Sequence, residues 1–167
     1  VTTPDSANFG PVGWNRLGHD IDGEAGGDYS GYSVSLSADG SIVAIGATRN
    51  DPDGLTNAGH VRVYQRDSTK TTADTDPDSA NFGPVGWNRL GQDIDGENPT
   101  DYSGQSVSLS ADGLTVAIGA FGNDPNGMNM AGHVRVYQYD STKTSAVTTP
   151  DSANFGPVGW NRLGQDI

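Results

Sequence analysis

Two acidic segments carry the residue types best suited to chemistry. Each has four carboxylates within nine residues, spaced around a Gly turn, and the second segment follows the first by 73 residues. The two sets are Asp20, Asp22, Glu24 and Asp28, and Asp93, Asp95, Glu97 and Asp101. Calcium takes six to eight oxygen ligands, and alternating acidic side chains supply oxygens on one side of a turn. The spacing therefore predicts a calcium site in each segment.

A capped turn without metal is the alternative for these segments. Asp and Gly are common turn residues, because Asp hydrogen-bonds to nearby backbone and Gly tolerates the turn conformation. The full EF-hand pattern is absent from the sequence. The calcium site and the capped turn are both compatible with these residues.

The remaining candidates for chemistry are few. His60 and His133 begin predicted strands without a second His or Cys nearby, which favours a strand-edge hydrogen bond over a zinc site. No Gly-x-Ser-x-Gly elbow, phosphate-binding loop or His-Glu-x-x-His motif occurs. A catalytic centre needs asymmetry, and two near-identical segments offer little of it. We therefore expect that the protein is not an enzyme.

The composition argues against several classes of partner. The 167 residues carry a net charge of −12 with nine Lys and Arg, whereas nucleic-acid binding needs cationic side chains that neutralise phosphates. No run of 18 apolar residues occurs, so no membrane insertion is expected. Cysteine is absent, which removes disulfides and thiolate metal sites.

The acidic segments belong to a longer internal repeat. Trp14, Trp87 and Trp160 are 73 residues apart, and residues 14–86 and 87–159 are identical at 56 of 73 positions. A fixed period of this kind marks a modular array. The predicted layout is a connector end at 1–13, complete repeats at 14–86 and 87–159, and the start of a third repeat at 160–167. This layout is typical of a window in a longer repetitive protein, and an engineered chain with overlapping ends is the alternative.

Each repeat is predicted to be all-β. The expected strands are 14–21, 32–37, 42–47 and 60–66, and 87–94, 105–110, 115–120 and 133–139. The 42–47 run is apolar at almost every position, as in a strand covered on both faces. Thr-, Asp- and Pro-rich connectors follow at 67–86 and 140–159. Four short antiparallel strands, one of them doubly covered, predict a β-propeller-like blade that stacks in an array.

Recurrent aromatic residues are expected to pack between the blades. One Trp begins each repeat, and one Phe recurs in each polar connector. The residues assigned to this packing are Trp14, Trp87, Trp160, Phe9, Phe82 and Phe155. Aromatic platforms for sugars are the alternative for the tryptophans and tyrosines.

Three motifs resemble the FG-GAP repeat of integrin-α-type β-propellers. They are Ser30–Val34, Val43–Ala47 and Gly59–Tyr64, and they recur at 103–107, 116–120 and 132–137. The resemblance implies an extracellular propeller with roles in adhesion or ligand binding. At the place of that family's calcium loop, this sequence has Ser37-Ala38-Asp39-Gly40, and one carboxylate does not make a calcium site. The family's metal loop is therefore not expected here.

Two blades and a fraction cannot close a ring, because propellers have four to eight blades. Further repeats or other copies of the chain must then cover the open apolar faces. We therefore expect a structural repeat protein, extracellular or at the cell surface, that self-associates and forms or decorates a filament or fibre. The alternative is a calcium-assisted adhesin or lectin-like propeller that binds a glycan or a protein surface.

Overall fold

Two antiparallel β-sheets make up the regular part of the chain in the computed structural model, which describes residues 10–149, 152 and 154–167. The first sheet has the order β1 (Ser30–Leu36), β2 (Ile42–Ala47), β3 (His60–Arg66) and β4 (Trp87–Arg89), and β5 (Ile94–Asp95) also pairs with β3. The second has the order β6 (Ser106–Leu109), β7 (Thr115–Ala120), β8 (His133–Tyr139) and β9 (Trp160–Arg162). The all-β prediction is confirmed, since helix in the described residues is confined to the short 3₁₀ turns Pro52–Gly54 and Pro125–Gly127.

The central strands agree with the sequence prediction. β2, β3, β7 and β8 have the predicted bounds, whereas β1 begins two residues early and β6 is shorter than expected. Every residue of β2 is buried, as predicted for a strand covered on both faces. The hydrophobic run of this strand is therefore explained by packing on two sides.

The strand predicted over 14–21 is wrong, because no residue of this segment is in a strand. The corresponding residues of the next repeats form β4 and β9, which pair with β3 and β8 of the repeat that precedes them. In register, Arg66 lies opposite Trp87 and Tyr139 lies opposite Trp160. At the same 73-residue offset, no described residue lies opposite Trp14, and the segment does not form a strand.

Each sheet thus takes its outer strand from the following repeat. The predicted strand over 87–94 is accordingly divided into β4 and β5, which both pair with β3 on either side of a turn at Gly91. The boundaries of the sheets are therefore offset from the sequence repeat that begins at Trp87. The residues of one repeat do not form the complete sheet, because the first residues of the next repeat supply its outer strand.

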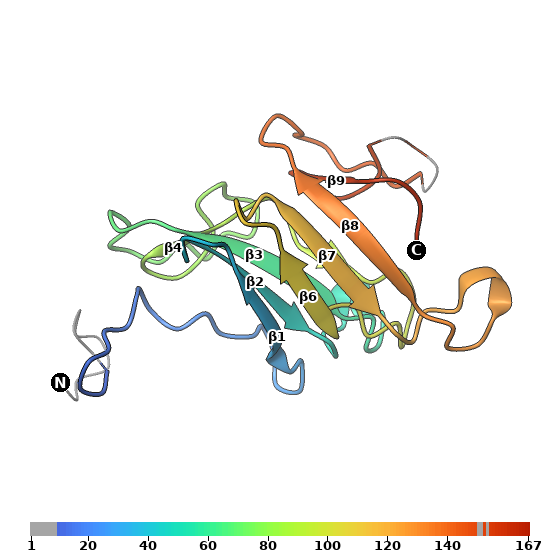
Figure 1. Cartoon of the computed structure of the whole chain (residues 1–167), viewed down its shortest axis with the longest axis horizontal. Coiled ribbons are helices and arrows are strands. Elements are labelled where there is room, and N and C mark those ends of the chain that lie inside the picture. Colours follow the sequence, from blue (N-terminus) through green and yellow to red (C-terminus); the bar gives the residue numbers. More distant parts are fainter. Residues whose placement is uncertain (1–9, 150–151, 153) are drawn as a thin grey trace.

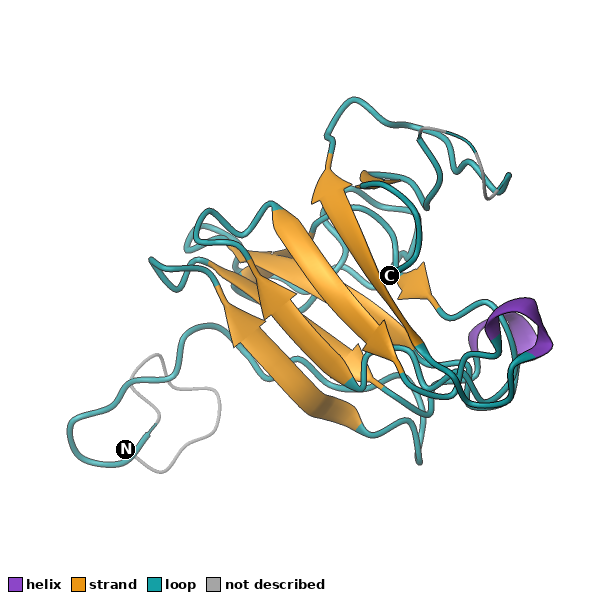
Figure 2. Cartoon of the chain, turned by 45° about the vertical axis from the view of Figure 1, so that its right-hand side comes forward, coloured by secondary structure: helices purple, strands orange, loops and turns teal. Residues whose placement is uncertain are grey.

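The two sheets stack face to face, and the second lies over the first (Figure 1, Figure 2). Along β2, Ile42 and Ala44 point into the core between the sheets, whereas Val43 and Ile45 pack on the opposite face. Gly46 allows a close approach here, because a Cβ at this position would collide with the backbone oxygen of Gly104. The two repeats therefore share one apolar core that neither forms alone.

Among the described residues, no helix has the length and apolar character needed to cross a membrane.

Candidate functional site

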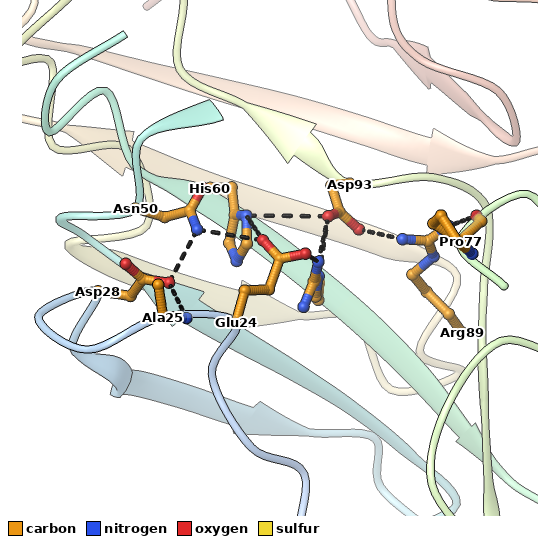
Figure 3. Close-up of polar contacts among 9 residues, drawn as sticks. Glu24, Ala25, Asp28, Asn50, His60, Pro77, Arg89 and Asp93 are labelled. Atoms are coloured by element: carbon orange, nitrogen blue, oxygen red, sulfur yellow. Dashed lines mark hydrogen bonds and ion pairs between the residues drawn. The ribbon is translucent and has the colours of Figure 1, made fainter. Parts of the chain in front are cut away.

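A group of charged side chains in the first repeat lies where the outer strand joins its sheet (Figure 3). Glu24 comes from the loop before β1, and His60 is the first residue of β3. Arg62 follows two positions later and therefore shares a face of the strand with His60. Asp93 lies in the turn between β4 and β5. Three chain segments, one of them from the next repeat, thus meet at this cluster.

Arg62 is the centre of an ion-pair network. Its Nε and Nη2 atoms donate to Asp93 Oδ2 at 2.8 and 2.7 Å, and Nη2 also contacts Glu24 Oε1. Arg89 Nη1 donates to the other carboxylate oxygen of Asp93 at 2.6 Å, and Arg89 Nη2 donates to the Pro77 carbonyl at 2.6 Å. The charges of two carboxylates and two guanidinium groups therefore balance.

The same network recurs in the second repeat. Arg135 donates to both carboxylate oxygens of Asp166 at 2.7 Å and lies 2.7 Å from Glu97 Oε2. Arg162 Nη1 donates to Asp166 Oδ1 at 2.8 Å, as Arg89 does to Asp93. The recurrence shows that the cluster is a property of the repeat and joins each repeat to the next.

Hydrogen bonding outweighs burial in setting the protonation of the charged groups. Burial opposes the charged form of Arg62, yet its bonds to Asp93 and Glu24 raise the pKa of the guanidinium. Burial also opposes ionisation of Asp93, yet the bonds and charges of Arg62 and Arg89 lower the pKa of its carboxyl. Both groups are therefore charged at neutral pH, as a buried ion pair requires.

For the two histidines, burial outweighs the attraction of the nearby carboxylates. His60 Nδ1 lies 3.8 Å from Asp93 Oδ2 and 3.9 Å from Glu24 Oε2, and His133 Nδ1 lies 3.6 Å from Asp166 Oδ2. These separations exceed hydrogen-bond length. Burial lowers the pKa of His60 and of His133 below the usual value, so both rings are neutral at pH 7.

The eight carboxylates predicted as calcium ligands do not converge within each loop. Asp28 Oδ2 accepts the Ala25 N–H at 2.9 Å and the Asn50 amide at 3.0 Å. Asp101 Oδ2 likewise accepts the Glu97 and Asn98 N–H groups at 3.2 and 3.0 Å and the Asn123 amide at 3.1 Å. Asp28 and Asp101 therefore cap their own turns.

The other six predicted ligands lie in three kinds of environment. Asp20 forms an exposed ion pair with Arg16 at 3.5 Å. Asp22 and Asp95 are exposed. The remaining three, which belong to the ion-pair clusters, are Glu24, Asp93 and Glu97. The structure thus brings Glu24 together with a carboxylate of the next repeat, 69 residues away, and not with its sequence neighbours.

Sequence reasoning favoured strand-edge hydrogen bonds for His60 and His133 and did not single out the arginines of the clusters. Their carboxylate partners are distant in sequence, so the sequence did not bring these residues together. A local signal existed, since His-Val-Arg recurs unchanged at 60–62 and 133–135 and Arg89 precedes Asp93 by four residues. That signal identifies charged partners only after the pairing of β3 with β4 is known.

The tryptophans have different environments. Trp160 is fully buried between the sheets, and its Nε1 donates to the Leu90 carbonyl at 2.9 Å. Trp87 is also buried and donates to the Leu17 carbonyl at 3.1 Å. Trp14 is 76% exposed, so among the described residues it has no buried environment like those of Trp87 and Trp160.

The connector phenylalanines contact arginines of the clusters. The Cζ atom of Arg89 lies 4.5 Å from the ring centroid of Phe82, and that of Arg162 lies 4.6 Å from Phe155. These cation–π contacts hold the connectors against the outer strands. Phe9 lies outside the described residues.

Comparison with known proteins finds one match, in the second repeat. Residues 95–137, which include β6, β7 and most of β8, match the FG-GAP repeat family. The resemblance seen in the sequence is confirmed, and the chain carries an FG-GAP-type repeat. Such repeats are typical of extracellular, adhesion-type domains. No curated protein and no solved structure gives a significant match to the chain.

Proposed function

We propose that this protein is an extracellular structural repeat protein whose propeller-like blades stack head to tail and build or decorate a surface fibre. The 73-residue repeats are the blades, and each blade packs on the next as the first sheet packs on the second. The supporting observation is that each of the two outward faces of the stacked sheets exposes apolar residues whose equivalents are buried at the junction between the sheets.

The leading face of the first sheet consists of Val34 and Leu36. Val34 and Leu36 are 63% and 60% exposed, yet their equivalents Val107 and Leu109 pack against the core between the sheets. An exposed apolar patch of this kind is typical of an interaction surface. The leading face therefore has the composition of a face that a preceding blade covers.

The trailing face of the second sheet consists of Val134, Leu163 and Ile167. Ile167 is 82% exposed, whereas its equivalent Ile94 is 2% exposed at the junction between the sheets. The other two residues differ in the same direction from their buried equivalents Val61 and Leu90. The trailing face therefore matches the surface that receives the next blade.

Polar contacts across the internal junction suit a junction between copies as well. Gln105 Nε2 donates to the Tyr32 hydroxyl at 3.1 Å. Because residues 32 and 105 are equivalent, a second copy docked in the same way would place its Tyr32 opposite Gln105 of the first. A Gln and a Tyr would then meet at the junction between copies too, with their places on the two blades exchanged, which is compatible with a repeating head-to-tail contact.

The test is assembly of the purified chain, measured by light scattering on a size-exclusion column and by negative-stain electron microscopy. We expect concentration-dependent fibres or closed rings. The double variant Val34→Ser/Leu36→Ser should shift the population to monomer, because it removes the apolar contact of the leading face.

The matched control is Met128→Ser/Met130→Ser. These residues are comparably exposed but lie in the loop before β8, outside both faces. The control should assemble like the unaltered chain. A chain that stays monomeric at high concentration, or a control that blocks assembly equally, would contradict the proposal.

A binding module is the second candidate function, and a repeated groove favours it. One groove of about 620 Å³ lies between the acidic loop at 93–97 and the connector residues 146–148 and 155–157. The equivalent groove of the first repeat measures about 500 Å³. Both are lined by carboxylates, Arg, Tyr and Phe, a combination that can bind sugars through hydrogen bonds and ring contacts.

A printed glycan panel tests this second function. Binding that falls with Asp95→Asn, an exposed residue of the larger groove, would support it, with Asp112→Asn in an exposed turn outside the groove as control. Absence of binding to every glycan on the panel would contradict a lectin.

A further inference from the structure

We propose that each Glu–His–Asp cluster is a Zn²⁺ site, so that the described residues hold two such sites, Glu24–His60–Asp93 and Glu97–His133–Asp166. In both, a histidine nitrogen and two carboxylate oxygens all lie within 4.8 Å of one another. The proposal is independent of self-association and of glycan binding.

The donor atoms are already close to tetrahedral spacing. Zinc binds nitrogen and oxygen ligands at about 2.0–2.2 Å, which puts neighbouring ligands of a tetrahedral site about 3.4 Å apart. His60 Nδ1 is 3.8 Å from Asp93 Oδ2 and 3.9 Å from Glu24 Oε2, and His133 Nδ1 is 3.6 Å from Asp166 Oδ2. These three separations exceed the tetrahedral spacing by about 0.2–0.5 Å, and the other pairs of donor atoms lie within 4.8 Å of one another.

A buried nitrogen without a partner points independently to a ligand. The side chain of His133 is 8% exposed and that of His60 is 5% exposed. The Nδ1 atom of His133 is buried and has no hydrogen-bond partner among the described residues. A buried polar atom left unsatisfied costs free energy, and a bound ion is one of its common explanations. This nitrogen lies 3.6 Å from Asp166 Oδ2, and the His133 ring offers a nitrogen within 4.8 Å of oxygens of both Asp166 and Glu97, which is where a cation would bind.

The donor set selects zinc over calcium. Calcium takes six to eight oxygens, and three donors that include an imidazole do not supply that shell. Imidazole combined with carboxylates suits zinc and its neighbours among the transition metals. Three protein ligands leave one position for water, as in open zinc sites. Glu24 is 48% exposed at its side chain, so both the ion and this water can reach the cluster.

The arginines are compatible with a bound ion as outer hydrogen-bond donors. Arg62 contacts Glu24 Oε1, whereas Glu24 Oε2 faces His60 and accepts one bond from Asn50 at 3.2 Å. The Asp93 oxygen that faces His60 is Oδ2, which accepts two bonds from Arg62 at 2.8 and 2.7 Å and would have to share its lone pairs with the ion. Ligating carboxylates are commonly held by such second partners. The positive charge of Arg62 opposes the metal, so the affinity is expected to be lower than in a structural zinc finger.

The position of the ligands gives the ion a structural effect. Glu24 and His60 belong to one repeat, and Asp93 belongs to the next (Figure 3). Bound zinc would therefore hold β4 and β5, which the next repeat supplies, against β3. The second cluster does the same for β9 through Asp166.

Isothermal titration of the untagged, chelator-treated chain with Zn²⁺ tests the proposal. We expect saturation at two ions per chain, one ion for His60→Gln or His133→Gln, and none for the double variant. His19→Gln is the matched control, because it introduces the residue found at the equivalent positions of the other repeats and lies outside both clusters. This control should still bind two ions.

A second readout needs no variant. In nuclear magnetic resonance spectra of the unaltered chain, Zn²⁺ should shift the imidazole ¹⁵N signals of His60 and His133 and leave His19 unchanged, and Ca²⁺ should shift none of them. Absence of Zn²⁺ binding, equal shifts with Ca²⁺, or two ions still bound by the double variant would each overturn the proposal.

Discussion

Asp93 follows Arg62 by 31 residues and belongs to the next repeat, yet its Oδ2 atom accepts hydrogen bonds from both Nε and Nη2 of that arginine. The pair joins the turn after β4 to the middle strand of the preceding sheet. Arg135 and Asp166 repeat the relationship at the next junction. The contact between consecutive repeats is thus polar at the outer strand and apolar in the core.

Asp93→Asn should destabilise the chain by about 1.5–3 kcal/mol, the usual contribution of a hydrogen bond to a charged group that is partly buried. The side chain of Asp93 is 19% exposed, so solvent replaces little of the lost interaction. The measurement is the free energy of unfolding in urea. Asp20→Asn is the control, because the equivalent residue is 74% exposed and only paired with Arg16. It should change stability by less than about 0.5 kcal/mol, and equal losses in the two variants would be inconsistent with a role of the junction.

Trp160→Ala should cost about 3–5 kcal/mol, because it removes a fully buried indole from the core between the sheets. Trp14→Ala alters the same repeat position on an exposed side chain and should cost little. Thermal unfolding of both variants provides the comparison. A large loss with Trp14→Ala would mean that this tryptophan is packed in solution.

Gly46→Ala should loosen the junction between the sheets. The new Cβ would collide with the Gly104 backbone oxygen, which cannot rotate away, and such overpacking costs about 1–3 kcal/mol. Gly119→Ala is the matched control, since its closest contact is the movable Ser106 hydroxyl. Denaturation midpoints should rank the control above Gly46→Ala, and the reverse order would contradict the close approach.

The pKa of Asp39 is lowered to about 2 by hydrogen bonds from the Ser37 hydroxyl and from the N–H and hydroxyl of Ser41. Because the folded pKa lies below the unfolded value, the stabilisation is complete above about pH 4. It is lost as the pH falls through the folded pKa.

Carboxyl ¹³C titration by nuclear magnetic resonance checks this assignment. Ser37→Ala and Ser41→Ala should each raise the pKa of Asp39 toward the value of a free side chain. An unchanged titration in both variants would show that other groups set this pKa.

The sequence alone predicted correctly those strands whose own residue pattern shows which faces are buried. The apolar run of β2 and the alternation in β3 state which faces are covered, so their bounds were correct. The prediction of a strand over 14–21 was wrong because the equivalent segments at Trp87 and Trp160 form strands by pairing with β3 and β8 of the repeat before them. Local sequence records that a side chain is apolar but not which repeat supplies the neighbouring strand.

The charged clusters were out of reach for the same reason. The sequence placed Glu24 near Asp20, Asp22 and Asp28, and the predicted site grouped these neighbours. In the fold, strand register brings Glu24 instead to Arg62 and Asp93. Ligand sets that span a strand pairing become visible only once the pairing is known.

Because each sheet takes its outer strand from the next repeat, we expect the sheets to be completed in chain order. As a chain emerges from its N-terminal end, β1, β2 and β3 can pair, but the edge of β3 stays open until residues 87–89 have followed through the connector at 67–86. The sheet of each repeat can therefore be completed only after the following connector and the first residues of the next repeat have been synthesised. In such an array, the sheets would be completed in order from the first repeat to the last. During synthesis, the most recent sheet would have an unpaired edge at its third strand.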